Sequence, residues 1–399
     1  MKKIVFIFLI TLSLTVFSAD YIFFFLGDGM GINHLKLANE YSIKKYGKTL
    51  NYNSLENLSI LNTESLDGVT DSAAAITSFM SFEKTNNNKI NIDKDGNKLN
   101  PVSYHFKDTN YKIAVITSNS IVDASPAGIY AKSNDRNNYT SIANQLLESQ
   151  FDLFIGGGRA FFTEEEILKK GYMYKRKIDI QAVEPKNEII LTSYSNNPFI
   201  FDQDEKDYYE KAIKYSLKKF EGEKFFIFIE GGKVDHASHA HDTLSMIEEI
   251  IAFDKSLKPA IDFYNKNPDN TIILFTADHE TGGLSLGDGF ININNLSSQK
   301  ISYDKLISMI NNSDDFDDFQ KKSNVYFLNE ENYNEALSDN NVSYFDDFVQ
   351  NYFNHYNDLA GIKWSTFGHT INNVALFSNG IKFDKSVHLT DIFWDIIKK

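Results

Sequence analysis

Short apolar runs followed by polar residues are the feature that most constrains the fold of this chain. Residues 21–26, 113–116, 151–155, 225–229, 272–275 and 374–377 are rich in Ile, Val, Leu and Phe and are predicted to be buried β-strands. Between them lie amphipathic stretches such as 209–217 and 244–251, whose apolar residues recur every three or four positions. This alternation predicts an α/β fold, a three-layer sandwich with helices on both faces of a large, mostly parallel central sheet.

Polar side chains follow several of these predicted strands at the point where each one ends. The segments are Gly27-Asp28-Gly29, Thr117-Ser118, Glu230-Gly231-Gly232 and Ala277-Asp278-His279. In open parallel sheets, ligand sites gather outside the carboxyl ends of the strands. Carboxylates and imidazoles at several such ends therefore predict one shared site.

Composition limits both the partners of the chain and the chemistry of that site. With 399 residues, 42% of them hydrophobic, the chain can bury one large core. Its formal net charge of −14 argues against a nucleic-acid-binding surface, because such surfaces are basic. The absence of cysteine excludes disulfides and thiolate chemistry, so metal ligands must be oxygen atoms or imidazole nitrogens.

The first 19 residues have the pattern of a signal peptide. Lys2 and Lys3 precede the apolar run 4–17, and the small residues Ser18 and Ala19 follow it. A membrane anchor is the alternative, but the run is shorter than the ~20 residues that span a bilayer. We expect cleavage at Ser18 or Ala19, export to the periplasm or the medium, no transmembrane segment afterwards, and one mature domain over 20–399.

Residues 284–363 differ in amino-acid composition from the rest of the chain. They are rich in Asn, Asp and Ser and carry an aromatic stripe of Phe345, Phe348 and Tyr352 at helical spacing. We expect an α-rich insertion over the edge of the sheet, with the stripe packed inside it. Such an insertion would line either the substrate entrance or a subunit interface.

Two Asp/His clusters after predicted strands indicate metal binding. Asp235 and His239 are four residues apart, so one helical turn would bring them to one cation, and Asp278-His279 supplies a second pair. Asp28 alone would read as a turn residue between glycines, but carboxylates at three strand ends suit two or three clustered divalent ions.

Ser72 and Arg136 are the candidates for handling a phosphate group. Ser72 precedes an alanine-rich segment, and a helix beginning there would aim its positive dipole end at an anion. Taken alone, Asp71-Ser72 favours a helix N-cap over a nucleophile. A nucleophilic Ser72 would be activated by a metal ion or by a histidine. Arg136 is one of three arginines, and its guanidinium can grip two phosphate oxygens.

Taken together and in order from Phe23 to Ile397, these segments resemble the alkaline phosphatase family. The motifs are Gly27-Asp28-Gly29-Met30-Gly31, Thr70-Asp71-Ser72-Ala73-Ala74, Asp123-Ala124-Ser125-Pro126-Ala127 through Arg136, Gly156-Gly157-Gly158-Arg159 and Phe367-Gly368-His369-Thr370. The resemblance implies a homodimeric enzyme that hydrolyses phosphate monoesters to alcohol and inorganic phosphate. Ser72 would attack phosphorus and form a covalent phosphoserine, which water then hydrolyses.

The resemblance also implies two Zn²⁺ and one Mg²⁺ in each chain. The first zinc would be held by Asp235, His239 and His369, the second by Asp28, Asp278, His279 and Ser72, and the magnesium by Asp28, Ser125 and Glu230. Asp71, Asp123 and His236 are expected just behind these ligands. Since a neighbouring imidazole can change which ion a site prefers, His236 bears on the identity of the third metal.

Other functions remain as alternatives. A phosphodiesterase or phosphonate hydrolase would use the same two-zinc core. Ser125, Glu230 and Arg136 favour a monoesterase, because a diester offers one free oxygen fewer. A metal- or phosphate-binding protein without activity is the alternative from another class. A sulfatase would need a Pro and Arg maturation motif, which residues 73–76 do not supply.

Overall fold

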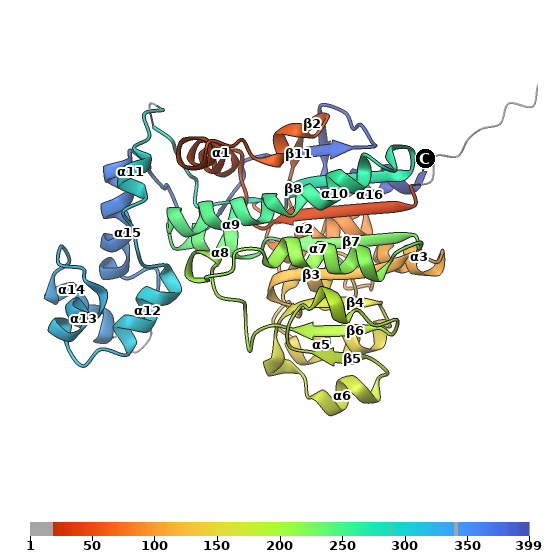
Figure 1. The fold of residues 1–399 in the computed structure, drawn as a ribbon, viewed down its shortest axis with the longest axis horizontal. Helices are drawn as coiled ribbons and strands as arrows, with labels where there is room; N and C mark the ends of the chain where they lie inside the picture. The colour runs from red at the N-terminus through yellow and green to blue at the C-terminus, as the bar shows by residue number, and fades with distance from the viewer. Residues whose placement is uncertain (1–18, 288, 339–341, 399) are drawn as a thin grey trace, which may run out of the picture.

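A ten-stranded sheet forms the centre of the protein in a computed structural model that describes residues 19–287, 289–338 and 342–398. Figure 1 shows the sheet running through the larger lobe. The strand order is β12-β2-β11-β8-β1-β7-β3-β4-β6-β5. The strands are β1 (Tyr21–Gly27), β2 (Asn57–Asn62), β3 (Lys112–Ser120), β4 (Leu153–Gly157), β5 (Met173–Lys175), β6 (Glu188–Leu191), β7 (Phe225–Glu230), β8 (Thr271–Ala277), β11 (Val374–Asn379) and β12 (Ser386–His388).

The sheet is mostly parallel, as the sequence predicts. β1 pairs in parallel with β7 and β8, and β3 pairs in parallel with β7 and β4. Strand β11 runs antiparallel to both of its neighbours, β2 and β8. Every residue of β8 is buried, and so is every residue of β7, as expected for strands covered on both faces.

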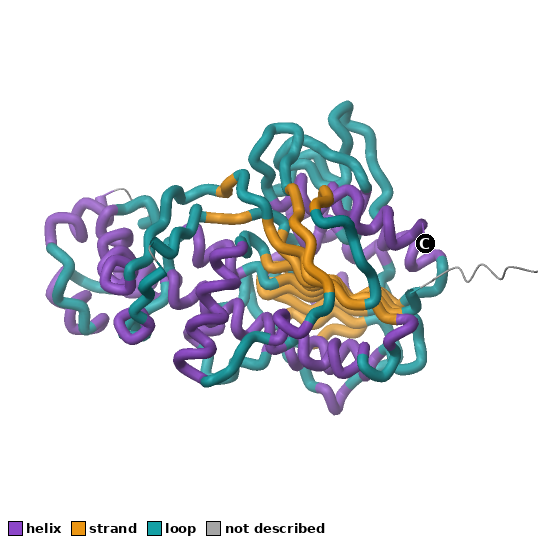
Figure 2. The backbone as a smooth tube through the Cα atoms, turned by 90° about the horizontal axis from the view of Figure 1, so that it is seen from above, coloured by secondary structure: helices purple, strands orange, loops and turns teal. Residues whose placement is uncertain are grey.

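Helices cover both faces of the sheet and complete the three layers (Figure 2). One layer contains α1 (Ile32–Tyr46), α7 (Tyr208–Lys219), α9 (Thr243–Lys255) and α10 (Leu257–Tyr264). The other contains α2 (Ser72–Ser81), α3 (Val102–Asp108), α4 (Ala124–Gly128) and α16 (Leu389–Lys398). Helices α5 (Tyr139–Ser149), α6 (Glu164–Lys169) and α8 (Lys233–His239) complete this part of the chain. The predicted helices at 209–217 and 244–251 are α7 and α9.

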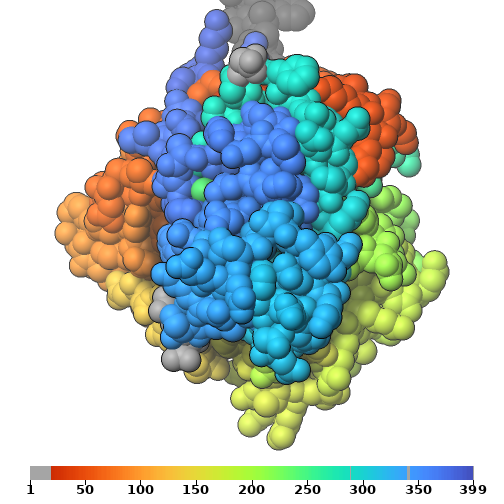
Figure 3. Space-filling model, turned by 90° about the vertical axis from the view of Figure 1, so that its left-hand side faces the viewer, coloured from red at the N-terminus to blue at the C-terminus, as the bar shows by residue number. Residues whose placement is uncertain are grey.

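The insertion is helical, and it lies beyond the carboxyl ends of the parallel strands rather than over an edge strand (Figure 1). Its surface occupies the centre of the face seen in Figure 3. Its helices are α11 (Ile293–Leu296), α12 (Tyr303–Asn311), α13 (Phe316–Ser323), α14 (Glu330–Ser338) and α15 (Asp347–Ala360). Residues between 301 and 353 form a hydrophobic cluster separate from the main core. Phe348 and Tyr352 are buried in this cluster, but Phe345 precedes α15 and is 63% exposed, because the chain turns before the helix begins.

A buried lysine joins the insertion to the sheet. Lys233 opens α8, directly after Gly231 and Gly232, and only 3% of its side chain is exposed. Its Nζ lies 2.9 Å from Asp304 Oδ2 on α12 and 3.8 Å from the centre of the Phe199 ring. The ammonium group therefore has both a carboxylate and an aromatic face as partners, as a buried charge requires.

The buried Glu249 on α9 gives a testable pH dependence of stability. It accepts hydrogen bonds from Ile200 N and the Tyr209 hydroxyl, and burial raises its pKa to about 7. Because this pKa lies above the unfolded value, the stability contribution of Glu249 falls as pH rises from about 4 to 7. We expect Glu249→Gln to remove that slope, so that its stability relative to wild type rises by at most about 3 kcal/mol between pH 4 and 8.

Urea denaturation at several pH values would measure this difference. The exposed Glu221→Gln is the control, and its stability relative to wild type should stay constant with pH. A constant difference for Glu249→Gln would contradict the assignment.

The predicted signal peptide, residues 1–19, lies outside the described residues except for Ala19. Among the helices of the described part of the chain, none is both long enough and apolar enough to cross a bilayer.

Candidate metal centre

The parallel register of three adjacent strands brings the predicted acidic residues together. Gly27 of β1 lies opposite Ala277 of β8, so the next residues, Asp28 and Asp278, leave the sheet side by side. Leu26 lies opposite Glu230 of β7, which places a third carboxylate at the same edge. The carboxyl ends of parallel strands therefore form the site, as the sequence predicts.

A two-stranded ribbon adds the most distant residue. β9 (Glu280–Thr281) pairs antiparallel with β10 (His369–Thr370), and His369 lies opposite Thr281. This pairing stacks the ring of His369 on that of His279, with centroids 3.6 Å apart. The ribbon thus brings His369, the predicted ligand nearest the C-terminus, to the site at the ends of β1, β7 and β8.

Asp235, His239 and His369 form a first group of ligand atoms that could hold one cation. One helical turn of α8 puts His239 Nε2 3.2 Å from Asp235 Oδ2, and His369 Nε2 lies 3.7 Å from Asp235 Oδ1. The side chains of His239 and His369 are 21% and 17% exposed. This group therefore faces solvent.

A second group surrounds Nε2 of His279, a fully buried side chain. This nitrogen lies 3.5 Å from Asp28 Oδ1, 3.4 Å from Asp278 Oδ2 and 3.4 Å from Ser72 Oγ. Asp28, Asp235 and His279 are also close enough to share one cation. Asp235 thus stands between the two groups, a position that its sequence motif does not reveal.

The Nδ1 atoms of all three histidines have partners, so each Nε2 points into the site. His239 Nδ1 contacts the Phe367 carbonyl, and His369 Nδ1 lies 2.9 Å from the Thr70 carbonyl. His279 Nδ1 lies 3.2 Å from the Thr281 hydroxyl. Metal-binding histidines are commonly oriented in this way.

A third cluster lies close to Asp28. Ser125 is in the first turn of α4, and Glu230 ends β7 and accepts a hydrogen bond from the Thr117 hydroxyl. Burial first, and then the charge of Asp123, raise the pKa of Glu230 to about 8. Asp28 and Glu230 also influence each other electrostatically, and Ser125 acts on the pKa of Glu230, so Glu230 links the predicted ligands of a third ion.

The chemistry of these residues fits bound cations. Among the described residues, Asp28 Oδ1, Asp278 Oδ2 and Ser125 Oγ are buried and have no hydrogen-bond partner. Burial and neighbouring carboxylates raise the pKa of Asp28 well above its usual value, and burial raises that of Asp278 to about 7. Buried carboxylates this close need positive charge to stay ionised, and divalent ions supply it.

Ser72 is the first residue of α2, and Asp71 is the N-cap. The Asp71 carboxylate accepts a hydrogen bond from Ala74 N at 2.9 Å. The N-cap role therefore belongs to Asp71 rather than Ser72, whose Oγ remains directed at His279. The start of this ten-residue helix also places its positive dipole end near the site.

Arg136 lies between two of the carboxylates expected behind the ligands. Its Nη1 is 3.1 Å from Asp71 Oδ2, and its Nη2 is 3.4 Å from Asp123 Oδ1. Its side chain is 23% exposed. The two carboxylates thus hold the guanidinium next to the start of α2, whose first residue is Ser72.

His236 is half-buried one position after Asp235. Burial and the charge of Lys233 lower its pKa, while Asp235 and Asp123 act in the opposite direction. The charges of Asp123 and Lys233 therefore act on the pKa of His236 in opposite directions. No direct hydrogen bond joins it to a predicted ligand within the described residues.

Sequence reasoning missed Thr281 and two backbone carbonyls that position the ligands, and it placed Thr117 at a strand end without giving it this role. Thr281 donates a hydrogen bond to Asp235 Oδ1 at 2.5 Å, and Thr117 donates one to Glu230. The carbonyls of Thr70 and Phe367 orient two histidines. Thr281 and Thr117 follow predicted strands, which is the pattern that could have indicated them, but backbone carbonyls have no such pattern.

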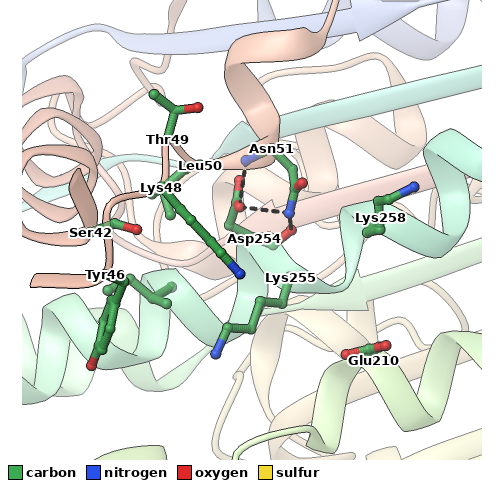
Figure 4. A pocket seen from close by; sticks show the side chains of 11 residues that line it. Ser42, Tyr46, Lys48, Thr49, Leu50, Asn51, Glu210, Asp254, Lys255 and Lys258 are labelled. Carbon is green, nitrogen blue, oxygen red and sulfur yellow. Dashed lines mark hydrogen bonds between the residues drawn. The ribbon is translucent and has the colours of Figure 1, made fainter.

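A cavity of about 560 Å³ lies elsewhere, on the layer formed by α1, α7, α9 and α10 (Figure 4). Lys48, Lys255 and Lys258 are among its lining residues, and Asn51 bonds Asp254 there. It contains none of the candidate site residues.

Comparison with known proteins agrees with this geometry. The family model described as alkaline phosphatase matches residues 19–179 and 201–391. The chain belongs to the alkaline phosphatase family. It is 27% identical over 390 residues to alkaline phosphatase 3 of Bacillus subtilis (strain 168), covering 89% of this chain and 82% of that protein. As a member of this family, it is a metal-dependent phosphatase.

Solved structures of alkaline phosphatases share the fold. The cold-active enzyme of a psychrophilic Shewanella species has a TM-score of 0.82 and 21% identity, with 95% of this chain and 99% of that chain covered. A mutant of the enzyme from the Antarctic bacterium TAB5, described with Mg bound in the M3 site, has a TM-score of 0.71 and 23% identity, with 96% and 97% covered. The predicted α/β architecture is therefore confirmed.

Proposed function

We propose that this alkaline phosphatase is a phosphomonoesterase that works through a covalent phosphoserine on Ser72. The observation that carries the proposal is the convergence of Ser72 Oγ, His279 Nε2 and the guanidinium of Arg136 at the start of α2. A nucleophile, a cation-ligand group and an anion clamp are the parts that phosphoryl transfer needs. Export and a homodimer remain expectations drawn from the family.

Two Zn²⁺ and one Mg²⁺ fit the donor sets. Asp235, His239 and His369 would hold one zinc, and Asp28, Asp278, His279 and Ser72 the other, since both sets combine nitrogen and oxygen donors. Asp28, Ser125 and Glu230 offer oxygen alone, which suits magnesium. The Mg described in the TAB5 mutant supports that choice. Bound, these ions would lower the pKa of the Ser72 hydroxyl and neutralise charge that develops on the substrate.

The protein residues divide the remaining work. Ser72 Oγ attacks phosphorus, the P–O bond to the alcohol breaks, and the phosphoryl group stays on Ser72 until water releases it. Arg136 has two Nη atoms to offer to free phosphoryl oxygens, while Asp71 and Asp123 keep its guanidinium in place. A monoester presents those oxygens together, whereas a diester has one of them esterified.

Comparing 4-nitrophenyl phosphate with bis(4-nitrophenyl) phosphate tests the proposal, because both release the same alcohol. We expect kcat/KM for the monoester to be at least about a hundredfold higher, since a diester leaves one donor of the clamp unpaired. A preference for the diester would favour the phosphodiesterase alternative. Hydrolysis of neither by protein that contains metal would favour a binding protein.

His236→Lys is expected to change activation by the third ion. An ammonium group beside Asp123 would repel a cation and compete for the carboxylate. The Mg²⁺ concentration for half-maximal activation should therefore change by roughly tenfold. Titration with Mg²⁺ and Co²⁺ measures this, and the exposed His105→Lys on α3 is the control. Unchanged activation by both ions would contradict a role for His236.

A further inference from the structure

Three aromatic side chains lie together beside the first group of metal ligands. The ring of Tyr344 stacks on that of His239, with centroids 5.8 Å apart and planes 21° from parallel. Phe345 contacts Tyr344 at 4.4 Å and Phe367 at 5.3 Å between centroids. We call Tyr344, Phe345 and Phe367 the aromatic ledge. It is built from the insertion and from the segment that carries His369.

The aromatic ledge is held in place from behind. Gln350 Nε2 donates a hydrogen bond of 2.6 Å to the Tyr344 carbonyl, and the Asp346 carboxylate accepts one of 2.5 Å from Ser343 N. The Phe367 ring stacks on His241 with centroids 4.4 Å apart and planes 8° from parallel. The backbone on either side of Phe345 and the ring of Phe367 are therefore held before any ligand arrives, which lowers the entropic cost of binding beside them.

Phe345 leaves a large apolar surface open to water. It is 63% exposed, although its two ring neighbours are half-buried. Another aromatic residue of the insertion, Tyr326, is equally exposed at 64%, but no ring contact ties it to the metal centre within the described residues. Of these two residues, only Phe345 contacts a side chain, Tyr344, that stacks on the candidate ligand His239. The exposed ring of Phe345 is therefore placed where a substrate at the metal centre could reach it.

The direction in which the alcohol leaves indicates which part of the substrate lies against Phe345. In an in-line displacement, the alcohol leaves on the side of phosphorus opposite Ser72. Ser72 lies against the buried His279, whereas His239 and His369 face solvent. The alcohol part of the ester therefore extends past His239, toward Tyr344 and Phe345.

We propose that the aromatic ledge binds the alcohol part of the substrate and favours monoesters whose alcohol carries a planar aromatic group. Stacking on a fixed ring stabilises such a group in both the bound ester and the transition state. This inference rests on the proposed monoesterase function. It names Phe345 as the residue that determines specificity and Tyr344 as its support.

Adenosine 5′-monophosphate and ribose 5-phosphate form the test pair, because both are phosphate esters of the primary 5-hydroxyl of a ribose and differ at C1, where only the nucleotide carries an aromatic base. We expect wild type to have the higher kcat/KM for the nucleotide. Phe345→Ala should lower this preference about fivefold while changing kcat/KM for ribose 5-phosphate less than twofold. Phe345→Leu, which keeps apolar bulk without a ring, should lose most of the preference, and the control Tyr326→Ala should keep it.

Dissociation constants of the same two esters on metal-loaded Ser72→Ala protein supply a second readout. Adding Phe345→Ala to that protein should weaken nucleotide binding about fivefold and leave ribose 5-phosphate unchanged. Equal effects on both esters, or no effect, would overturn the inference. So would a change of oligomeric state in Phe345→Ala without a change in preference, which would make this surface a protein interface. Failure of wild type to hydrolyse either ester would instead refute the monoesterase function.

Discussion

Ser72→Ala is expected to lower kcat/KM for 4-nitrophenyl phosphate by at least about a thousandfold. Removal of a covalent nucleophile eliminates the phosphoseryl route and leaves the contributions of positioning and charge. The substitution deletes one hydroxyl at the first position of α2, while Asp71 still caps the helix through Ala74 N. Helix stability should therefore change little. Steady-state kinetics of the metal-loaded protein would measure the loss.

Ser78→Ala is a matched control on the same helix. The Ser78 hydroxyl bonds the Ala74 carbonyl at 3.0 Å and does not reach the site. Its kcat/KM should remain within severalfold of wild type. Acid quenching during turnover, followed by peptide mass spectrometry, should show one phosphoryl group on Ser72 in wild type. Activity that survives in Ser72→Ala would refute the nucleophile assignment.

Removal of metal is expected to abolish activity and lower the melting temperature, and Asp278→Asn should separate these effects. Asp278 is fully buried beside Asp28 and His279, and burial raises its pKa to about 7. Without cations, the carboxylates in this centre destabilise the fold, because their charges are buried and adjacent. Asp278→Asn removes one of them. The metal-free variant should therefore melt several degrees above metal-free wild type, although its activity is lost.

Thermal melts with a chelator and with added Zn²⁺ and Mg²⁺ would measure both effects. Asp254→Asn is the control, because Asp254 on α9 is also buried but accepts hydrogen bonds from Asn51 N and Tyr52 N, which are not part of the metal centre. It should keep the full increase in melting temperature on metal addition. If Asp278→Asn also keeps that increase, Asp278 does not contribute to metal binding.

Much of the fold could be predicted from local patterns, but not all of its geometry. Apolar runs identify β1, β3, β7 and β8, since strands buried on both faces must be apolar throughout. The run 374–377 predicts β11 equally well, yet gives no sign that this strand is antiparallel. Strand direction depends on how the chain returns from the insertion, which local composition does not encode.

In the candidate site too, some positions could be predicted from local sequence and others could not. Residues that follow strands, such as Asp28 and Asp278, could be predicted because register fixes where they leave the sheet. Asp235 belongs to both ligand groups because the start of α8 places its carboxylate near His239 and His369 as well as near Asp28 and His279, and local sequence does not encode this placement. Phe345 is the clearest failure, because helical spacing predicts packing and the turn before α15 exposes the ring.

The lysine at the start of α8 makes the insertion hard to remove. Lys233 follows the turn after Glu230 and has Asp304 of α12 as its carboxylate partner. A shortened protein that lacks α12 would leave this ammonium group with only the Phe199 ring, two residues before the candidate metal ligand Asp235. Shorter and longer versions of this enzyme would therefore have to differ at position 233 as well. Loss of the insertion and replacement of this lysine should occur together in evolution.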